Sequence, residues 1–230
     1  MRLTQYINES EIAETYAKIM VDRITKNCKP YLKLLKGREP IKRGMDSGDF
    51  IWSPGSTNEA GLKKVRQDRL SKAGIDQEVY RKINIWLKAH KGAQRDKSVI
   101  GVTKPGSHAF SWFGPQHWIW PTGNFKYTFV ESHDFNSSSR NWELSKFTAF
   151  IKWHYPAREE MEWQTKVNGE VTKTSHYKPI DYFHINKDFD LAYNKGYEIW
   201  FECKTYYYVK VENAIENIWQ HIAKIMKFPY

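Results

Sequence analysis

The sequence has few cysteines and no long apolar run. Only Cys28 and Cys203 occur among the 230 residues, and they form no CxxC pair, which excludes a zinc-finger or dithiol redox motif. No apolar stretch approaches the roughly 18 residues that a membrane helix needs, and the N-terminus lacks a basic region followed by an apolar one. We therefore expect reduced thiols, no membrane partner and a cytoplasmic location.

Several motifs of nucleotide-binding and metal-dependent enzymes are also missing. The eight histidines show neither an HExxH motif nor a paired ligand spacing, so we expect no metal. The sequence contains no GxGxxG and no GxxxxGKS/T pattern, which argues against a Rossmann dehydrogenase and a P-loop enzyme. A GxSxG nucleophile elbow is absent as well. None of these common enzyme classes is therefore indicated.

Aromatic residues and positive charge are abundant instead. Aromatic residues make up 16% of the chain, with ten tryptophans, and the formal net charge is +10. The aromatic residues are sufficient for a hydrophobic core, so we expect a folded chain. The charge favours anionic partners such as nucleic acid, nucleotide phosphates or an acidic protein surface. Because the basic residues are spread along the chain, the charge alone also fits a merely soluble basic protein.

Periodicity and turn residues predict helices first and mostly strands afterwards. Helices are predicted at residues 8–27, 31–35 and 141–154, from the N-cap Asp76 to just before Gly92, and from about Glu212. Strands are predicted at residues 40–44, 98–103, 117–120, 125–130 and in two segments after Glu198, with a hairpin at Asn168-Gly169. This order predicts an α+β fold. Residues 1–36 would form a helical segment packed on a core domain of residues 37–230.

Three short elements stand out when they are taken together. Arg43-Gly44 follows an early strand, Ser98–Thr103 forms a middle strand, and Glu198 stands at the head of a late apolar run that continues after a turn as Tyr206–Val209. In this order they resemble the arginine-serine-glutamate branch of the ADP-ribosyltransferase superfamily. The resemblance covers roughly residues 38–211.

The resemblance implies a fold, an activity and a cellular location. The fold would be a split core of two small, mostly antiparallel sheets with N-terminal helices and a C-terminal helix. The activity would be transfer of ADP-ribose from NAD to a protein or nucleic-acid acceptor with release of nicotinamide, or hydrolysis of NAD when water replaces the acceptor. Residues 95–114 also look similar to uncharacterised phage-encoded members, which implies an effector that acts on a host component in the host cytoplasm.

The chemistry of NAD cleavage explains the residue types at these positions. Arg43, next to Gly44, would clamp the two phosphates of NAD, because a guanidinium binds phosphate in a bidentate manner. Glu198 would stabilise the oxocarbenium-like centre that forms when the nicotinamide leaves. The hydroxyl of Thr103, or with less support that of Ser98, would position the ribose or the acid. The strand ends Gly101-Val102-Thr103, whereas the family usually has a serine-threonine-serine signature.

Four further residues have weaker claims to a functional role. Trp112 and Phe113 would contribute to the NAD site by stacking on nicotinamide or on a base, although core packing is the commoner fate of such side chains. Arg66 and Arg69 would reach phosphates or the target. The default interpretation is that both arginines lie on a solvated face of a helix or loop.

Gly196 and Glu202 bear on the specificity of the proposed site. The family often has Glu or Gln two residues before the glutamate, and Gly196 at that position argues against an arginine acceptor and leaves the acceptor open. Glu202 lies four residues after Glu198, on the same strand face, and ranks second as the catalytic acid.

A second interpretation stays open beside the enzyme. It is a basic, aromatic-rich module that binds nucleic acid or a host protein without chemistry. The two interpretations differ in whether Glu198→Gln abolishes release of nicotinamide from NAD.

Overall fold

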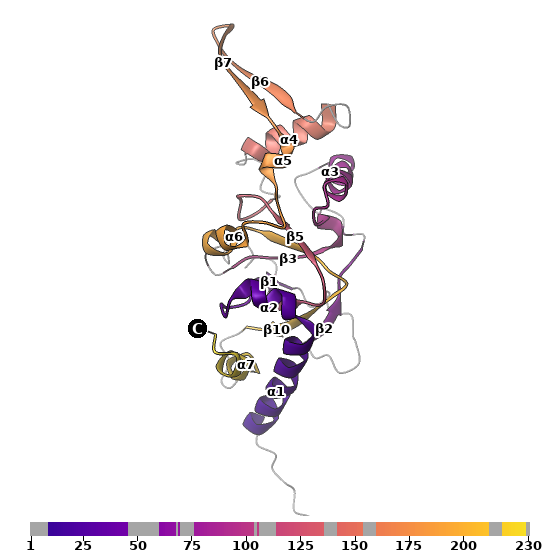
Figure 1. The fold of residues 1–230 in the computed structure, drawn as a ribbon, viewed down its shortest axis with the longest axis vertical. Helices are drawn as coiled ribbons and strands as arrows, with labels where there is room; N and C mark the ends of the chain where they lie inside the picture. Colours follow the sequence, from indigo (N-terminus) through magenta and orange to yellow (C-terminus); the bar gives the residue numbers. More distant parts are fainter. Residues whose placement is uncertain are drawn as a thin grey trace, which may run out of the picture.

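Two small antiparallel sheets occupy the middle of an elongated molecule (Figure 1). The computed structural model describes residues 9–45, 60–67, 69, 76–103, 105, 114–135, 142–153, 160–211 and 218–228. Over these residues the chain forms seven α-helices and three antiparallel sheets. The α+β class predicted from the sequence is therefore confirmed.

The strands of each central sheet come from distant parts of the chain. The first sheet has the order β1-β4-β10-β2, formed by Lys42–Gly44, Gln116–Pro121, Thr205–Lys210 and Ala60–Lys64. The second sheet has the order β3-β9-β5-β8, formed by Ser98–Gly101, Ile199–Glu202, Lys126–Phe129 and His184–Ile185. All neighbouring strands in both sheets are antiparallel. The early, middle and late elements singled out in the sequence thus become β1, β3 and β9.

The helices surround these sheets. They are α1 (Glu9–Asn27), α2 (Lys29–Leu35), α3 (Gln77–Ala89), α4 (Trp142–Trp153), α5 (Pro179–Tyr182), α6 (Phe189–Lys195) and α7 (Ile218–Met226). Asp76 caps α3 as predicted, because its side chain accepts hydrogen bonds from the amides of Glu78 and Val79 at 2.9 and 3.1 Å. None of the helices in the described ranges is long and apolar enough to cross a bilayer.

Two apolar cores lie on opposite faces of the second sheet. Ile199 and Phe201 of β9 belong to a first core, which also contains Met20 and Ile24 of α1. Trp200, between them, belongs to a second core with residues of α3 and α4. This alternation is the period of two that a strand imposes. Glu198, two residues before Trp200, therefore lies on the face of the second core.

The two central sheets meet where β1 passes the end of β3. Lys42 and Val102 exchange backbone hydrogen bonds of 2.7 and 2.8 Å. Gly101 allows this close approach, since a Cβ atom there would lie 2.6 Å from Ile41 Cγ2 and 2.7 Å from the Lys42 carbonyl oxygen. The contact brings Arg43, the next residue of β1, beside β3.

Gly101→Ala is expected to destabilise the fold by about 1–3 kcal/mol, because the added methyl group meets backbone that cannot move independently. The free energy of unfolding in urea measures this effect. A change below about 0.5 kcal/mol would contradict the close packing of β1 on β3.

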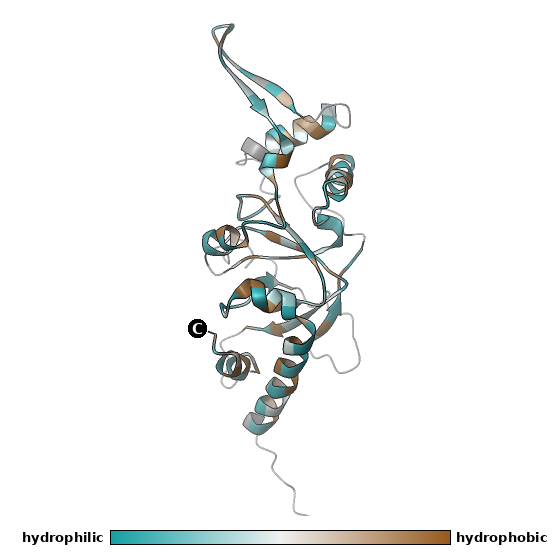
Figure 2. Ribbon diagram, in the orientation of Figure 1, coloured by the Kyte–Doolittle hydropathy of each residue, from teal (hydrophilic) through white to brown (hydrophobic). Residues whose placement is uncertain are grey.

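A hairpin projects from one end of the molecule (Figure 1). Its strands are β6 (Met161–Val167) and β7 (Glu170–Tyr177), and the turn residues Asn168 and Gly169 have φ values of 52° and 86°. Positive φ at both positions is the two-residue turn that Asn-Gly predicts. Figure 2 shows the projecting part mostly in hydrophilic and neutral colours, in keeping with its exposed side chains.

Candidate functional site: three arginines around Glu198

Glu198 lies directly before β9 with its side chain in the core. Its exposed fraction is 1%. Its Oε1 atom accepts hydrogen bonds from Nε and Nη2 of Arg95, both at 3.1 Å, and from the Trp200 indole at 2.5 Å. Its Oε2 atom accepts one from the Phe135 amide at 3.2 Å. The carboxylate is thus held by four donors, as a buried charge requires.

Arg95 is the counterion of Glu198. It stands in a short 3₁₀ helix, Arg95–Lys97, that leads into β3, and it is 5% exposed. Its guanidinium carbon lies 5.4 Å from the ring centre of Phe135 and 5.7 Å from that of Trp200. Burial opposes the charge, but electrostatic interactions with Glu198 and Tyr80 together outweigh burial and raise the pKa of Arg95. Arg95 therefore keeps its positive charge.

Arg43 lies half-buried next to this pair. Its Nη1 atom donates to the carbonyl of Ile100 at 3.1 Å, while its Nε atom is buried without a hydrogen-bond partner. Ile100 pairs across the sheet with Trp200, whose indole donates to Glu198. Arg43 thus reaches the region of the ion pair from the first sheet.

Arg69 approaches the same region from another segment. Its amide donates to the carbonyl of Asp96, the neighbour of Arg95, at 3.1 Å. Burial first, and then the positive charges of Arg43 and Arg95, lower the pKa of Arg69 to about 9. Arg43 and Arg95 are therefore each close enough to Arg69 to oppose its charge, and we call Arg43, Arg69 and Arg95 the arginine cluster.

Among the described residues, the arginine cluster has more positive than negative charge. Glu198 pairs with Arg95 and also acts on the charge of Arg69. No acid in the described ranges forms an ion pair with Arg43 or Arg69. Guanidinium groups in this setting favour a phosphate or carboxylate ligand. Strongly perturbed pKa values are also commoner at functional sites than elsewhere.

Ser98 lies at the far end of β3 from Glu198. It pairs with Glu202, four residues further along β9, which is about 13 Å at the rise of a strand. Its hydroxyl donates to the carbonyl of Gln94 at 2.5 Å. The structure therefore does not bring Ser98 to the carboxylate of Glu198.

Thr103 lies at the end of β3 that is nearer to Glu198. The last pair of the ladder joins Gly101 to Ile199, and Thr103 follows two residues later. Its buried hydroxyl donates to the carbonyl of Tyr193 at 2.6 Å. The hydroxyl thus fixes the end of β3 against α6.

Gly44 and Glu202 were also predicted as possible site residues, and both lie on strands of the central sheets. Gly44 ends β1 opposite Gln116. The Oε2 atom of Glu202 accepts a hydrogen bond from the Gln94 amide at 2.8 Å, so this acid is engaged at the far end of β9. Trp112 and Phe113, predicted to stack on the ligand, lie outside the described residues.

Gly196 has a backbone role. It ends α6 with a φ of 72°, and its amide donates to the carbonyl of Ala192. This left-handed helix end is the conformation that glycine adopts most easily. The glycine two residues before Glu198 therefore has a structural cause of its own.

Arg95 was not predicted as a site residue. It precedes its strand by three residues, in a segment without a helical or strand period, and no local motif marks it as the partner of Glu198. Arg69 was predicted only as one of two arginines that would reach a phosphate. The tertiary fold, rather than any sequence spacing, pairs Arg95 with Glu198 and joins the Arg69 amide to Asp96 beside Arg95.

The two cysteines are buried thiols. Burial raises the pKa of Cys28 and of Cys203 to about 12, and both are free rather than disulfide-bonded. A thiol with such a pKa is protonated at neutral pH and is a poor nucleophile. Neither cysteine therefore has the properties of a catalytic residue.

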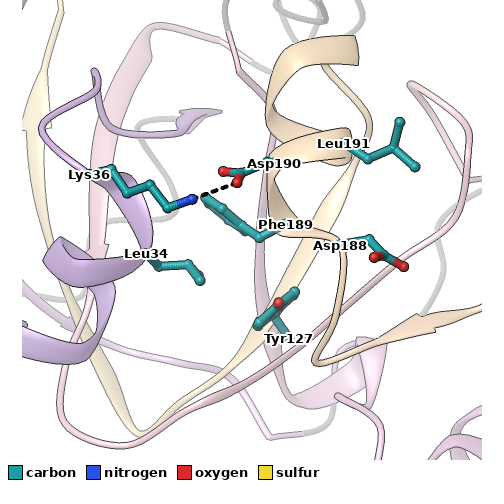
Figure 3. Close-up of a pocket in the computed structure, with 7 residues that line it drawn as sticks. All are labelled: Leu34, Lys36, Tyr127, Asp188, Phe189, Asp190 and Leu191. Atoms are coloured by element: carbon teal, nitrogen blue, oxygen red, sulfur yellow. Dashed lines mark hydrogen bonds and ion pairs between the residues drawn. The ribbon is translucent and has the colours of Figure 1, made fainter.

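A pocket of about 400 Å³ lies between α2 and α6 (Figure 3). It is lined by Leu34, Lys36, Tyr127, Asp188, Phe189, Asp190 and Leu191. The two oxygens of Asp190 bind Lys36 Nζ and Arg38 Nη2, both at 2.6 Å, and these hydrogen bonds lower the pKa of Asp190. The arginine cluster contributes nothing to this pocket. We give the arginine cluster priority, because the cations at the pocket are already paired with an acid.

Comparison with protein-family models gives no match, and comparison with curated proteins and with solved structures gives no significant match. Within the described ranges, no group of three or more His, Cys, Asp or Glu side chains is arranged to hold a metal ion.

Proposed function

We propose that the protein transfers ADP-ribose from NAD to a macromolecular acceptor, protein or nucleic acid, and releases nicotinamide. One observation carries the proposal. Arg43 lies on β1 and Glu198 lies directly before β9, far apart in the sequence. Arg43 nevertheless donates to the carbonyl of Ile100, and the partner of Ile100 on β9, Trp200, donates its indole N–H to Glu198. Both charges also act on Arg69. A phosphate-binding cation and a carboxylate near each other are what cleavage of NAD requires.

Glu198 would act at the nicotinamide ribose. When the bond between C1′ and the nicotinamide nitrogen breaks, its electron pair leaves with the nicotinamide and positive charge develops at C1′. A carboxylate beside this centre stabilises the charge and accepts a hydrogen bond from the 2′-hydroxyl. A nucleophile of the acceptor then forms a bond to C1′ and loses its proton. Water in the same place would give free ADP-ribose.

Arg43 and Thr103 would position the substrate. The buried Nε atom of Arg43 has no hydrogen-bond partner and is available to a phosphate oxygen. Thr103 would act indirectly, because its hydroxyl already binds the Tyr193 carbonyl and holds the end of β3 in place. We assign no role in NAD binding to Ser98, since its hydroxyl is engaged at the far end of the strand.

The acceptor class can be determined by label transfer. The purified protein is incubated with a cell lysate and NAD that carries ³²P in its adenylate phosphate, and protein is separated from nucleic acid before counting. We expect label in one fraction, together with free nicotinamide, and neither with Glu198→Gln.

The opposite result would be an absence of label and of nicotinamide with every extract tested. If the protein then bound DNA or RNA with a steep dependence on salt, it would be the non-enzymatic binding module, because release of counterions produces that dependence.

A further inference from the structure

We propose that Arg43, Arg69 and Arg95 together form a binding site for a phosphate or pyrophosphate group, and that the bound group draws Arg95 away from Glu198. Where the group belongs to NAD, the inference rests on the proposed function. The anion site itself does not depend on NAD as the substrate.

The first argument is the convergence of donors from three segments. Arg43 comes from β1 and hydrogen-bonds to Ile100 of β3, Arg95 comes from the 3₁₀ helix before β3, and the Arg69 amide binds Asp96 beside Arg95. Arginine is suited to this task, because each planar guanidinium offers five N–H donors in a fixed geometry. The Nε atom of Arg43 is buried and unpartnered, although a buried donor is normally satisfied.

The second argument is the charge of the cluster. A doubly charged anion would balance the charges of Arg43 and Arg69, with which no acid of the described ranges forms an ion pair. The pKa of Arg69, near 9 in this arrangement, would then rise, because an opposite charge favours the protonated form. A bound anion would thus complete the charge balance of the described part of the site.

The third argument is the coverage of Glu198. The carboxylate is 1% exposed, and Arg95 supplies two of its four hydrogen bonds. A substrate cannot reach a carboxylate that is covered in this way. A phosphate group that competes for Arg95 would remove these two donors, while the Trp200 indole and the Phe135 amide keep Glu198 in position. Binding of the anion would therefore expose the carboxylate.

Isothermal titration calorimetry with ADP tests the site on the full-length protein. We expect wild-type protein to bind ADP but not adenosine, which lacks phosphates. Arg69→Gln is expected to weaken ADP binding at least about tenfold, since a hydrogen bond to a charged group is lost. Arg81→Gln is the matched control, because Arg81 lies exposed on α3, and its ADP affinity should equal that of wild type.

The pH dependence of ADP affinity distinguishes a direct role of Arg69 in binding from a purely structural role, because a structural role would not make the affinity depend on protonation of Arg69. Below pH 9 Arg69 is protonated without ligand, and above pH 9 it must take up a proton when the anion binds. Affinity should therefore fall as the pH rises through about 9, while the charge of ADP stays constant because its phosphate titrates near pH 6. Arg69→Gln should lack this step.

The displacement of Arg95 can be followed through the Trp200 indole N–H, which donates to Glu198. ADP should shift its nitrogen-15 and proton NMR signals in wild type and in Arg81→Gln. Binding of ADP without this shift would overturn the displacement of Arg95.

Failure of the anion site and failure of the proposed function can be told apart. Equal ADP affinities of wild type and Arg69→Gln would overturn the anion site, even if NAD is cleaved. Binding of ADP as described, with NAD left intact, would support the anion site and refute the proposed function.

Discussion

Glu198→Gln is expected to lower the rate of nicotinamide release from NAD at least about 100-fold. Glutamine has nearly the same shape as glutamate but no negative charge, so it cannot stabilise the cationic transition state. Loss of one aligned electrostatic group typically costs about 10²–10³ in rate. Initial rates of nicotinamide release, measured by chromatography at saturating NAD, give the size of the effect.

Two variants make this result specific to Glu198. Glu162→Gln removes an exposed acid of the hairpin and should leave the rate unchanged. Glu202→Gln tests the second-ranked acid, which binds the Gln94 amide at the far end of β9, and its rate should stay close to that of wild type. A large loss with Glu202→Gln and none with Glu198→Gln would move the catalytic role to Glu202.

Arg95→Met is expected to reduce the free energy of unfolding by about 3–5 kcal/mol, because it leaves the Glu198 carboxylate buried without its counterion. Methionine fills much of the same space, so lost packing contributes less to the effect. Urea unfolding at pH 7 measures the change, and an unchanged m-value shows that the unfolding reaction is the same.

The double variant Arg95→Met/Glu198→Leu distinguishes the cost of an unpaired buried charge from the cost of other lost contacts. Replacing both charges with apolar side chains removes the unpaired charge, so the double variant should regain most of the stability that Arg95→Met loses. If Arg95→Met changed stability by less than about 0.5 kcal/mol, the buried ion pair would be contradicted.

Long amphipathic segments and specific turns were predictable from the sequence. α1, α3 with its cap Asp76, and the Asn168-Gly169 hairpin all follow from local spacing and turn chemistry. β2 and α6 are among the elements that were not predicted. β2 reads Ala-Gly-Leu-Lys-Lys, with little strand propensity, and forms because β10 pairs with it. α6 has only seven residues and is too short to be stable without tertiary packing.

The candidate site was predictable only where a local sequence pattern marks a residue. Arg43 lies on a recognisable strand and Glu198 directly precedes one, so the sequence could indicate them. The separation of Ser98 from Glu198 depends on the antiparallel register of β3 and β9, which no local pattern specifies. The role of Arg95 depends on a side chain that reaches Glu198 over the ring of Trp200.

The burial of Glu198 has a consequence for the mechanism. A carboxylate held by four donors is well placed, but it is inaccessible until Arg95 moves. We therefore expect the protein without ligand to be an inactive form, and the phosphates of NAD to start the change that exposes Glu198.

Proton NMR of NAD during incubation with the purified protein tests the central claim most directly. Free nicotinamide has its own ring proton signals, so the spectra follow cleavage of the glycosidic bond without a label or a coupled enzyme. We predict that these signals grow with wild-type protein in the presence of cell extract and stay at the background level with Glu198→Gln. If wild-type protein leaves NAD intact with every extract, the proposed activity is contradicted.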